Sequence, residues 1–297
     1  MTITLHATQP TSEAIFSYQR WIPQLPRLKE IYRNNLPFPH IVLDHSLSED
    51  AAENALKEFP QVDSETWIHY IHVNERKFGK TDLSSFEPTL QAVIQELNSE
   101  RFLHFLSELS GIKGLFADPT LEGGGLHQSR RGGFLNIHAD FTAHPHHRDW
   151  QRRINVLVYL NRDWKSNWGG HLELWDKCMK KKVRKIAPFF NRCVIFNTDA
   201  DAFHGHPQPL TCPEGVTRKS IALYYFTKES NLFVRSTEYK ARPNDGVKSV
   251  FIFFDKWVLR IYDHVKRRTG INDRLASKML SILHRIKTKA ASFFKQK

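Results

Sequence analysis

A histidine and an aspartate separated by one residue lie in the apolar run GGFLNIHADF, as His138 and Asp140. If this run is a strand, residues i and i+2 share a face, so both side chains can reach one point. A second histidine, His204, follows in FNTDADAFHGHP. Two imidazoles and one carboxylate form a facial triad that suits Fe(II) and leaves three coordination positions open. The pattern therefore predicts an iron site.

The chain offers rivals for parts of this triad. It has 16 histidines, and His147 and Asp149 repeat the H-x-D pattern a few residues later. We prefer the first pair because an apolar strand positions side chains rigidly, whereas HPHHRDWQRR is typical of a loop. His206 competes with His204 as the more distant ligand.

A cation and a hydroxyl stand together after the last of these histidines. Arg218-Lys219-Ser220 opens the strand-like run KSIALYYF, so Arg218 and Ser220 should share a face. A guanidinium fork beside a hydroxyl is well shaped to bind a carboxylate. We therefore expect a carboxylate ligand near Arg218.

These residues lie in a region of short apolar or alternating runs, from about 112 to 228, which Gly, Pro, Asn and Asp interrupt. The runs are GLHQS, GGFLNIHADF, INVLVYLN, GGHLELWD, KKVRKIA, RCVIFN and KSIALYYFT. Seven or eight short strands at this spacing indicate a sandwich or barrel rather than a parallel α/β sheet.

Helical patterns flank the strand region on both sides. Residues 12–34 and 86–110 have helical periodicity, and 36–60 predicts a short strand at 39–43 followed by a helix. Two more helical patterns, each with an apolar stripe and a basic remainder, occupy 249–268 and 272–295.

The ordered motifs resemble the iron(II)- and 2-oxoglutarate-dependent dioxygenases, on the prolyl-4-hydroxylase-like branch of the double-stranded β-helix fold. The matching pieces, all between residues 112 and 228, are His138-Ala139-Asp140, VLVYLNRDW, WGGHLELW, FHGHP and GVTRKSIALYYF. The segment PFPHIVLDHSL is also similar to the N-terminal part of bacterial members. We therefore expect an α+β protein with a double-stranded β-helix (jelly-roll) core, an N-terminal helical layer and C-terminal basic amphipathic helices. The expected divisions are 1–111 for helical support, 112–230 for the oxygenase core and 231–297 for the basic extension.

The resemblance also implies roles for single residues. The residues that match the iron ligands are His138, Asp140 and His204. Arg218 matches the basic residue that pairs with the distal carboxylate of 2-oxoglutarate, Tyr159 matches a tyrosine that hydrogen-bonds the same carboxylate, and Ser220 assists. No catalytic residue is implied beyond the metal ligands. The implied cofactors are Fe(II), 2-oxoglutarate as co-substrate and O2, with ascorbate as an optional addition.

The net charge of +12 is concentrated at one end of the chain. Residues 240–297 hold 15 Lys/Arg and 4 Asp/Glu, a net of +11, so the first 239 residues are almost neutral. This distribution argues against nucleic acid as a partner of the main body. For 249–297 three interpretations stay open: packing of the two helices on each other, on the core or on a second subunit; contact with an anionic membrane surface or an acidic polymer; and, least favoured, contact with nucleic acid. The sequence leaves the oligomeric state undetermined.

We find no run of 18 apolar residues and no signal peptide, and the three cysteines show no CxxC spacing. These features favour a cytoplasmic protein, either free or peripheral to a membrane. The predicted activity is hydroxylation of an unactivated C–H bond in a peptidyl substrate, prolyl residues included, or in a small molecule, with release of succinate and CO2. The alternatives are a catalytically inactive oxygenase-fold binding module, or a membrane- or polymer-associated protein acting through its basic tail.

Overall fold

The computed structural model describes residues 14–62, 66–246 and 249, and in these residues all the strand pairings are antiparallel and belong to one sheet. The main path through the sheet runs β1-β10-β7-β12-β5-β3-β6-β11-β8-β9, and β2, β4 and β13 join it at the side. The strands are β1 (His40–Asp44), β2 (Ile68–His72), β3 (Glu75–Lys80), β4 (Phe116–Ala117), β5 (Gly125–Ser129), β6 (Phe134–Ala139), β7 (Trp150–Tyr159), β8 (Leu172–Trp175), β9 (Lys182–Ile186), β10 (Arg192–Asn197), β11 (His204–His206), β12 (Arg218–Lys228) and β13 (Glu238–Tyr239).

The sheet curls over on itself. Tyr159 of β7 and Phe196 of β10 share a buried cluster with Leu172 and Leu174 of β8, although β8 lies near the opposite end of the strand path. Such contacts require the two halves of the sheet to face each other across an apolar layer, which is the jelly-roll arrangement. The jelly-roll core predicted from the sequence is therefore confirmed.

The seven strand-like runs of the sequence all form strands, namely β5 to β10 and β12. The helices are shorter than the helical patterns of the sequence. They are α1 (Tyr18–Trp21), α2 (Leu25–Asn34), α3 (Glu49–Lys57), α4 (Pro88–Leu97) and α5 (Glu100–Ser110), with 3-10 turns at Ile22–Gln24, Leu83–Ser85 and Ser166–Trp168. The single helix expected over 86–110 is two helices, because the Ser99 side chain caps a new helix by accepting from the N–H of Phe102.

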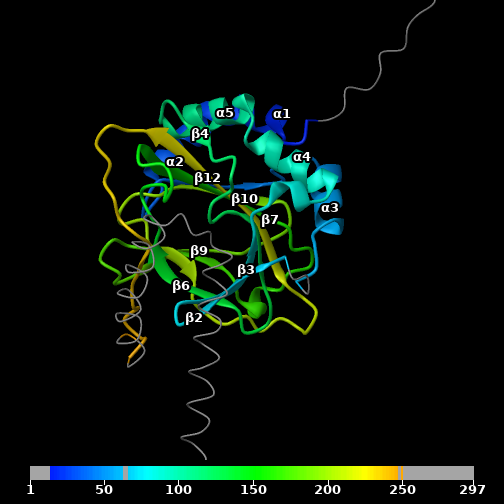
Figure 1. Cartoon of the computed structure of the whole chain (residues 1–297), viewed down its shortest axis with the longest axis vertical. Helices are drawn as coiled ribbons and strands as arrows, with labels where there is room; N and C mark the ends of the chain where they lie inside the picture. Colours follow the sequence, from blue (N-terminus) through cyan, green and yellow to red (C-terminus); the bar gives the residue numbers. More distant parts are fainter. Residues whose placement is uncertain (1–13, 63–65, 247–248, 250–297) are drawn as a thin grey trace, which may run out of the picture.

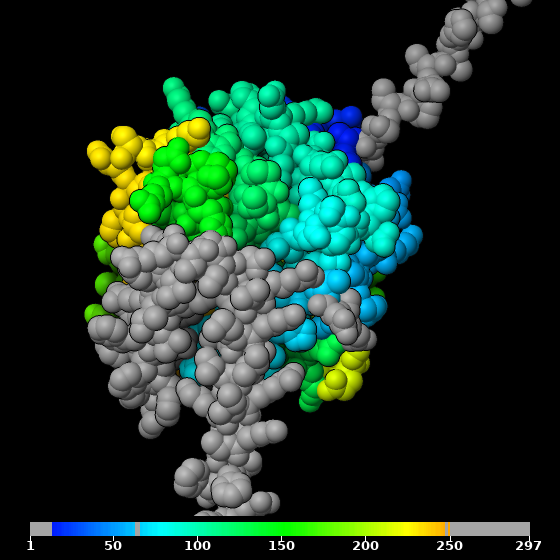
Figure 2. All heavy atoms as spheres, in the orientation of Figure 1, coloured from blue at the N-terminus to red at the C-terminus, as the bar shows by residue number. Residues whose placement is uncertain are grey.

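The largest hydrophobic cluster joins helices to strands. Leu90 of α4 and Phe102 of α5 pack in one cluster with Val156 of β7, Ile195 of β10 and Ile221 of β12. Helices α1, α3, α4 and α5 gather along one side of the sheet, away from β6 and β9 (Figure 1). In the space-filling view of the same face, residues around α3 to α5 form a continuous surface at the upper right (Figure 2). Strand β6, which carries His138, lies outside this helix-covered part (Figure 1).

Segments on either side of the predicted oxygenase core also enter the sheet. Before it, β1 pairs with β10, and β3 pairs with both β5 and β6. After it, β13 returns to β6, where Tyr239 stands opposite His138. The two basic helices predicted at 249–268 and 272–295, and the membrane contact expected of them, lie outside the described residues apart from position 249. No helix in the described part of the chain has both the length and the apolarity needed to cross a membrane.

Candidate metal centre and carboxylate site

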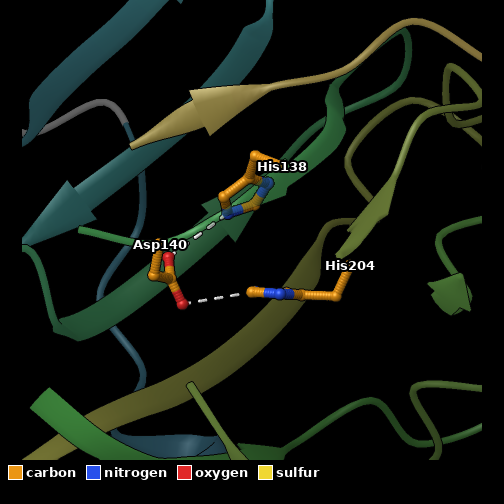
Figure 3. A group of neighbouring side chains, drawn as sticks. All are labelled: His138, Asp140 and His204. Atoms are coloured by element: carbon orange, nitrogen blue, oxygen red, sulfur yellow. Dashed lines mark ion pairs between the residues drawn. The ribbon is translucent and has the colours of Figure 1, made fainter. Parts of the chain in front are cut away.

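Three side chains that the sequence predicts as metal ligands lie together where β6 and β11 pair. His138 and His204 are register partners on these two strands, and Asp140 directly follows β6. Asp140 Oδ1 lies 3.4 Å from His138 Nε2, and its Oδ2 lies 3.5 Å from His204 Nε2. Figure 3 shows the three side chains pointing toward one another. Both imidazoles are almost fully buried.

The other nitrogen of each imidazole fixes its orientation. His138 Nδ1 lies 2.9 Å from the carbonyl oxygen of Asn136, and His204 Nδ1 lies 2.9 Å from that of Ala202. A carbonyl oxygen only accepts, so each Nδ1 must donate, and the lone pair of the neutral imidazole is then on Nε2. Burial lowers the pKa of His204 to about 4, so its Nε2 is unprotonated at neutral pH. Histidine metal ligands typically show this arrangement.

The carboxylate of Asp140 is held by two residues of β7 that the sequence did not single out for this role. Asn155 Nδ2 donates to Asp140 Oδ2 at 2.8 Å, and Arg152 Nη2 lies 3.1 Å from the same oxygen. Burial alone would raise the pKa of Asp140, but the Arg152 guanidinium, with His204 and His138, holds that pKa well below its usual range. Asp140 is therefore an anion at neutral pH even without a metal.

Neither rival from the sequence joins this group. His147 is exposed and stacks on Trp150 with ring centroids 3.9 Å apart. His206 is buried opposite Leu135 of β6, and its Nδ1 has no hydrogen-bond partner among the described residues. Within the same residues, the one set of three or more His, Cys, Asp or Glu side chains that could hold a metal ion is His138, Asp140 and His204.

The cation expected to bind a carboxylate is buried beside a tyrosine hydroxyl. Arg218, at the start of β12, donates through Nε to the Gly170 carbonyl at 2.8 Å and through Nη2 to Tyr159 Oη at 3.1 Å. Ser220 is the register partner of Tyr159 on the neighbouring strand. Burial raises the pKa of Tyr159, so its hydroxyl keeps a proton that it can donate to a ligand.

No acidic side chain in the described part of the chain pairs with Arg218, although only 6% of this residue is exposed. A buried guanidinium without a counter-ion is costly, which indicates that an anionic ligand supplies the missing charge. The triad likewise fits a divalent iron: it offers two neutral nitrogens and one anionic oxygen. The two donor sets together suit Fe(II) and a dicarboxylate.

Comparison with known proteins agrees with this geometry. Residues 124–226 match the family model of the 2OG-Fe(II) oxygenase superfamily. A mouse (Mus musculus) protein named prolyl 3-hydroxylase OGFOD1 is 27% identical over 197 residues, covering 64% of this chain and 33% of that protein. The chain thus spans about a third of the length of that relative.

A solved structure shares the fold. It is a prolyl hydroxylase from Trichoplax adhaerens in complex with a peptide fragment of the hypoxia inducible factor oxygen degradation domain. Its TM-score is 0.50 at 21% sequence identity, over 69% of this chain and 91% of that one.

The fold, the site and the matched region define an oxygenase that uses iron(II) and 2-oxoglutarate. Residues 124–226 thus resemble the 2OG-Fe(II) oxygenase superfamily, and the mouse protein and the Trichoplax adhaerens protein to which the chain is similar are both named as prolyl hydroxylases.

Proposed function

We propose that this protein hydroxylates a residue of a peptide or protein, with 2-oxoglutarate as the co-substrate. The observation that carries the proposal is the buried group of His138, Asp140 and His204, together with a buried cation, Arg218, that pairs with no acidic side chain of the described residues. We assign iron to the first group. We assign the distal carboxylate of 2-oxoglutarate to Arg218, with Tyr159 and Ser220 beside it.

The residues of the chain would divide the work as follows. The iron, when bound, supplies the activation of dioxygen that oxidises a C–H bond while 2-oxoglutarate is converted to succinate and CO2. His138 and His204 offer neutral nitrogens, and Asp140 offers the negative charge. Arg218 and Tyr159 hold the far end of the co-substrate and so orient its 2-oxo acid end. The apolar layer around Tyr159 excludes water from the buried end.

A peptidyl substrate, prolyl residues included, is favoured over a free small molecule by the names of the relatives. The mouse protein is named a prolyl 3-hydroxylase, and the Trichoplax adhaerens enzyme is in complex with a peptide fragment. A binding module that had lost turnover would be expected to lack part of its donor set, yet all the predicted site residues are present. Which residue of which protein is modified is left to experiment.

The cofactor assignment is tested by anaerobic titration of the metal-free protein with Fe(II) and 2-oxoglutarate. A chelated 2-oxo acid on Fe(II) gives a weak visible charge-transfer band, which we expect for the wild type and not for His138→Ala. His147→Ala is the matched control, because His147 belongs to the second H-x-D pattern and lies outside the triad. If the wild type gives no band and calorimetry detects no binding, the proposed function is wrong.

The substrate class is tested separately by succinate release. The metal-loaded enzyme is incubated with 2-oxoglutarate and either a library of proline-containing peptides or a panel of free amino acids and saccharides. We expect stimulation above the uncoupled rate by peptides, with a gain of about 16 Da on the peptide that stimulates. Stimulation by small molecules alone would overturn the peptidyl assignment and leave the cofactor assignment intact.

A further inference from the structure

A cleft of about 380 Å³ lies beside β8, and Gly170 at its wall is the residue whose carbonyl Arg218 contacts. Three parts of the chain form this β8–β9 cleft: the turn before β8 with the first part of that strand, the strand β9, and the segment that follows β11. The described residues that line it include none of those assigned above to iron or to 2-oxoglutarate. Clefts of about 300–1,000 Å³ typically hold small organic ligands, so this one is large enough for a ligand of its own.

The β8–β9 cleft carries one positive charge that the described residues do not neutralise. The acidic residue in its wall is Glu173, which is 4% exposed. Glu173 Oε1 lies 3.0 Å from Lys182 Nζ, and Glu173 Oε2 accepts from Trp175 Nε1 at 3.0 Å. Both oxygens are thus engaged, and Lys185, the register partner of Glu173 on β9, has no ion-pair partner in the described part of the chain. Because Lys182 and Glu173 cancel, the cleft keeps the charge of Lys185.

Two imidazoles in the wall of the cleft are more than nine-tenths buried. His206 is 4% exposed, and its Nδ1 has no hydrogen-bond partner among the described residues. His171 is 8% exposed, and its Nε2 lies 3.4 Å from Ser166 Oγ. Burial lowers the pKa of His171, and the charges of Lys185 and Arg218 lower this pKa further, so positive potential reaches the ring from both residues. A buried nitrogen without a partner costs free energy, and an acceptor on a bound ligand would satisfy it.

We propose that the β8–β9 cleft binds a small molecule that carries a phosphate group. Lys185 supplies the positive charge. A hydroxyl, an amide and an imidazole line the other walls, from Ser166, Asn167 and His206. A lysine ammonium is a point charge whose donors rotate, whereas a planar carboxylate is matched best by an arginine fork. Donors that approach from several walls suit the tetrahedral oxygens of a phosphate, and the volume leaves room for an organic group attached to it.

The experiment uses the metal-free protein without 2-oxoglutarate, so its result does not depend on the proposed function. Inorganic phosphate, glycerol 2-phosphate and the dicarboxylate malonate are titrated separately by calorimetry at low salt. We expect both phosphates to bind, glycerol 2-phosphate more tightly, and malonate to bind at least tenfold more weakly than either.

Lys185→Gln should weaken the binding of both phosphates about tenfold or more, because a charged hydrogen bond is lost. Arg184→Gln is the matched control: it removes the same charge from the preceding residue of β9, which does not line the cleft, and it should bind like the wild type.

A second variant tests the wall opposite β9. Asn167→Asp changes an exposed side chain in the turn before β8 and places a negative charge in the cleft, so it should weaken phosphate binding at least as much as Lys185→Gln. Arg218→Met should keep phosphate binding, since Arg218 does not line the cleft.

The proposal is overturned if the wild type binds neither phosphate, or if Lys185→Gln and Asn167→Asp bind both like the wild type. Equal losses in Lys185→Gln and Arg184→Gln would mean a general effect of surface charge and would also overturn it. Loss in Arg218→Met with full binding in Lys185→Gln would place the phosphate at the predicted carboxylate site instead. Malonate binding as tight as phosphate would refute the phosphate assignment.

Discussion

Replacing Arg218 with methionine should weaken the binding of 2-oxoglutarate without lowering the stability of the ligand-free protein. Burial lowers the pKa of Arg218, which shows that the folded protein disfavours the charge, and no carboxylate of the described residues compensates it. Methionine keeps much of the side-chain length without the charge. The ligand-free variant should therefore be as stable as the wild type or more stable.

The expected loss of co-substrate affinity follows from the charged hydrogen bonds to the carboxylate that methionine cannot make. Hydrogen bonds to a charged group contribute about 1.5–3 kcal/mol, so the dissociation constant for 2-oxoglutarate should rise about 10- to 150-fold. The assay is denaturant unfolding with Mn(II), with and without 2-oxoglutarate at about 100 times the wild-type dissociation constant. The wild type should gain about 2.7 kcal/mol of stability. A variant with 100-fold weaker binding should gain only about 0.4 kcal/mol.

Arg184→Met is the matched control, since Arg184 is an exposed arginine on β9. It should leave both the ligand-free stability and the 2-oxoglutarate effect unchanged. The reasoning is refuted if Arg218→Met keeps the full 2.7 kcal/mol gain that mass action predicts for undiminished binding. A loss of more than about 2 kcal/mol in the ligand-free variant would also refute it, because Arg218 would then be a structural residue whose removal leaves buried partners unsatisfied.

Three further predictions concern the two binding sites and a buried carboxylate. His204→Ala should abolish binding of Mn(II) by calorimetry, whereas His206→Ala should retain one ion per chain; the reverse result would exchange the two histidines as ligand. Gly170→Ala should weaken 2-oxoglutarate binding about tenfold or more, because the φ of Gly170 is +70° and the added Cβ would lie 2.9 Å from Arg218 Cδ. Gly215→Ala is the control, since Gly215 has a φ of +80° but open space around it. That variant should lose only about 1–2 kcal/mol of stability through backbone strain. For Asp118, burial would raise the pKa, but hydrogen bonds from His144, Thr120 and Glu122 outweigh it and lower the pKa from 3.8 to about 2. Asp118→Asn should therefore lower the free energy of unfolding by about 1–2 kcal/mol at pH 7, and urea titrations should show the difference shrinking as the pH falls through 3.8 toward 2.

The residues that the sequence could place are those governed by strict alternation along a strand. His138 with Asp140 and Arg218 with Ser220 each occupy positions i and i+2, and the structure brings each pair to one region. His204 could be placed because its motif stands at a recognisable position in the chain. For the two i and i+2 pairs, the period of the backbone determines which side chains share a face.

Arg152 could not be placed in this way, because the strand that carries it is irregular. In strict alternation Arg152 and Asn155, three residues apart, would point to opposite faces of β7. The register with β12 passes from Ile154 to Arg152 between Tyr225 and Phe226, so Arg153 is the extra residue of a bulge. That bulge reverses the faces and turns Arg152 toward Asp140. A sequence shows an arginine pair here, but it does not show which strand position has no partner.

The hairpin of β2 and β3 was missed for a different reason. Its inward positions include charged residues rather than apolar ones: Glu75 is buried, with Lys77 at 3.2 Å and His72 at 2.7 Å from its carboxylate oxygens. A search for alternating apolar residues assigns such charged residues to the surface. They are tolerated inside because they satisfy one another, which only the three-dimensional arrangement reveals.

The return of β13 to β6 has a practical consequence for anyone who shortens this gene. A chain cut at 230, where the sequence predicts the oxygenase core to end, would lose the strand that borders His138 and the ring of Tyr239, whose centroid lies 5.3 Å from that of His138. It would also lose the backbone bond from Thr142 to the carbonyl of Arg235. The smallest fragment suited to crystallisation or NMR therefore ends after Lys240, whose N–H bonds the Ile137 carbonyl in the middle of β6.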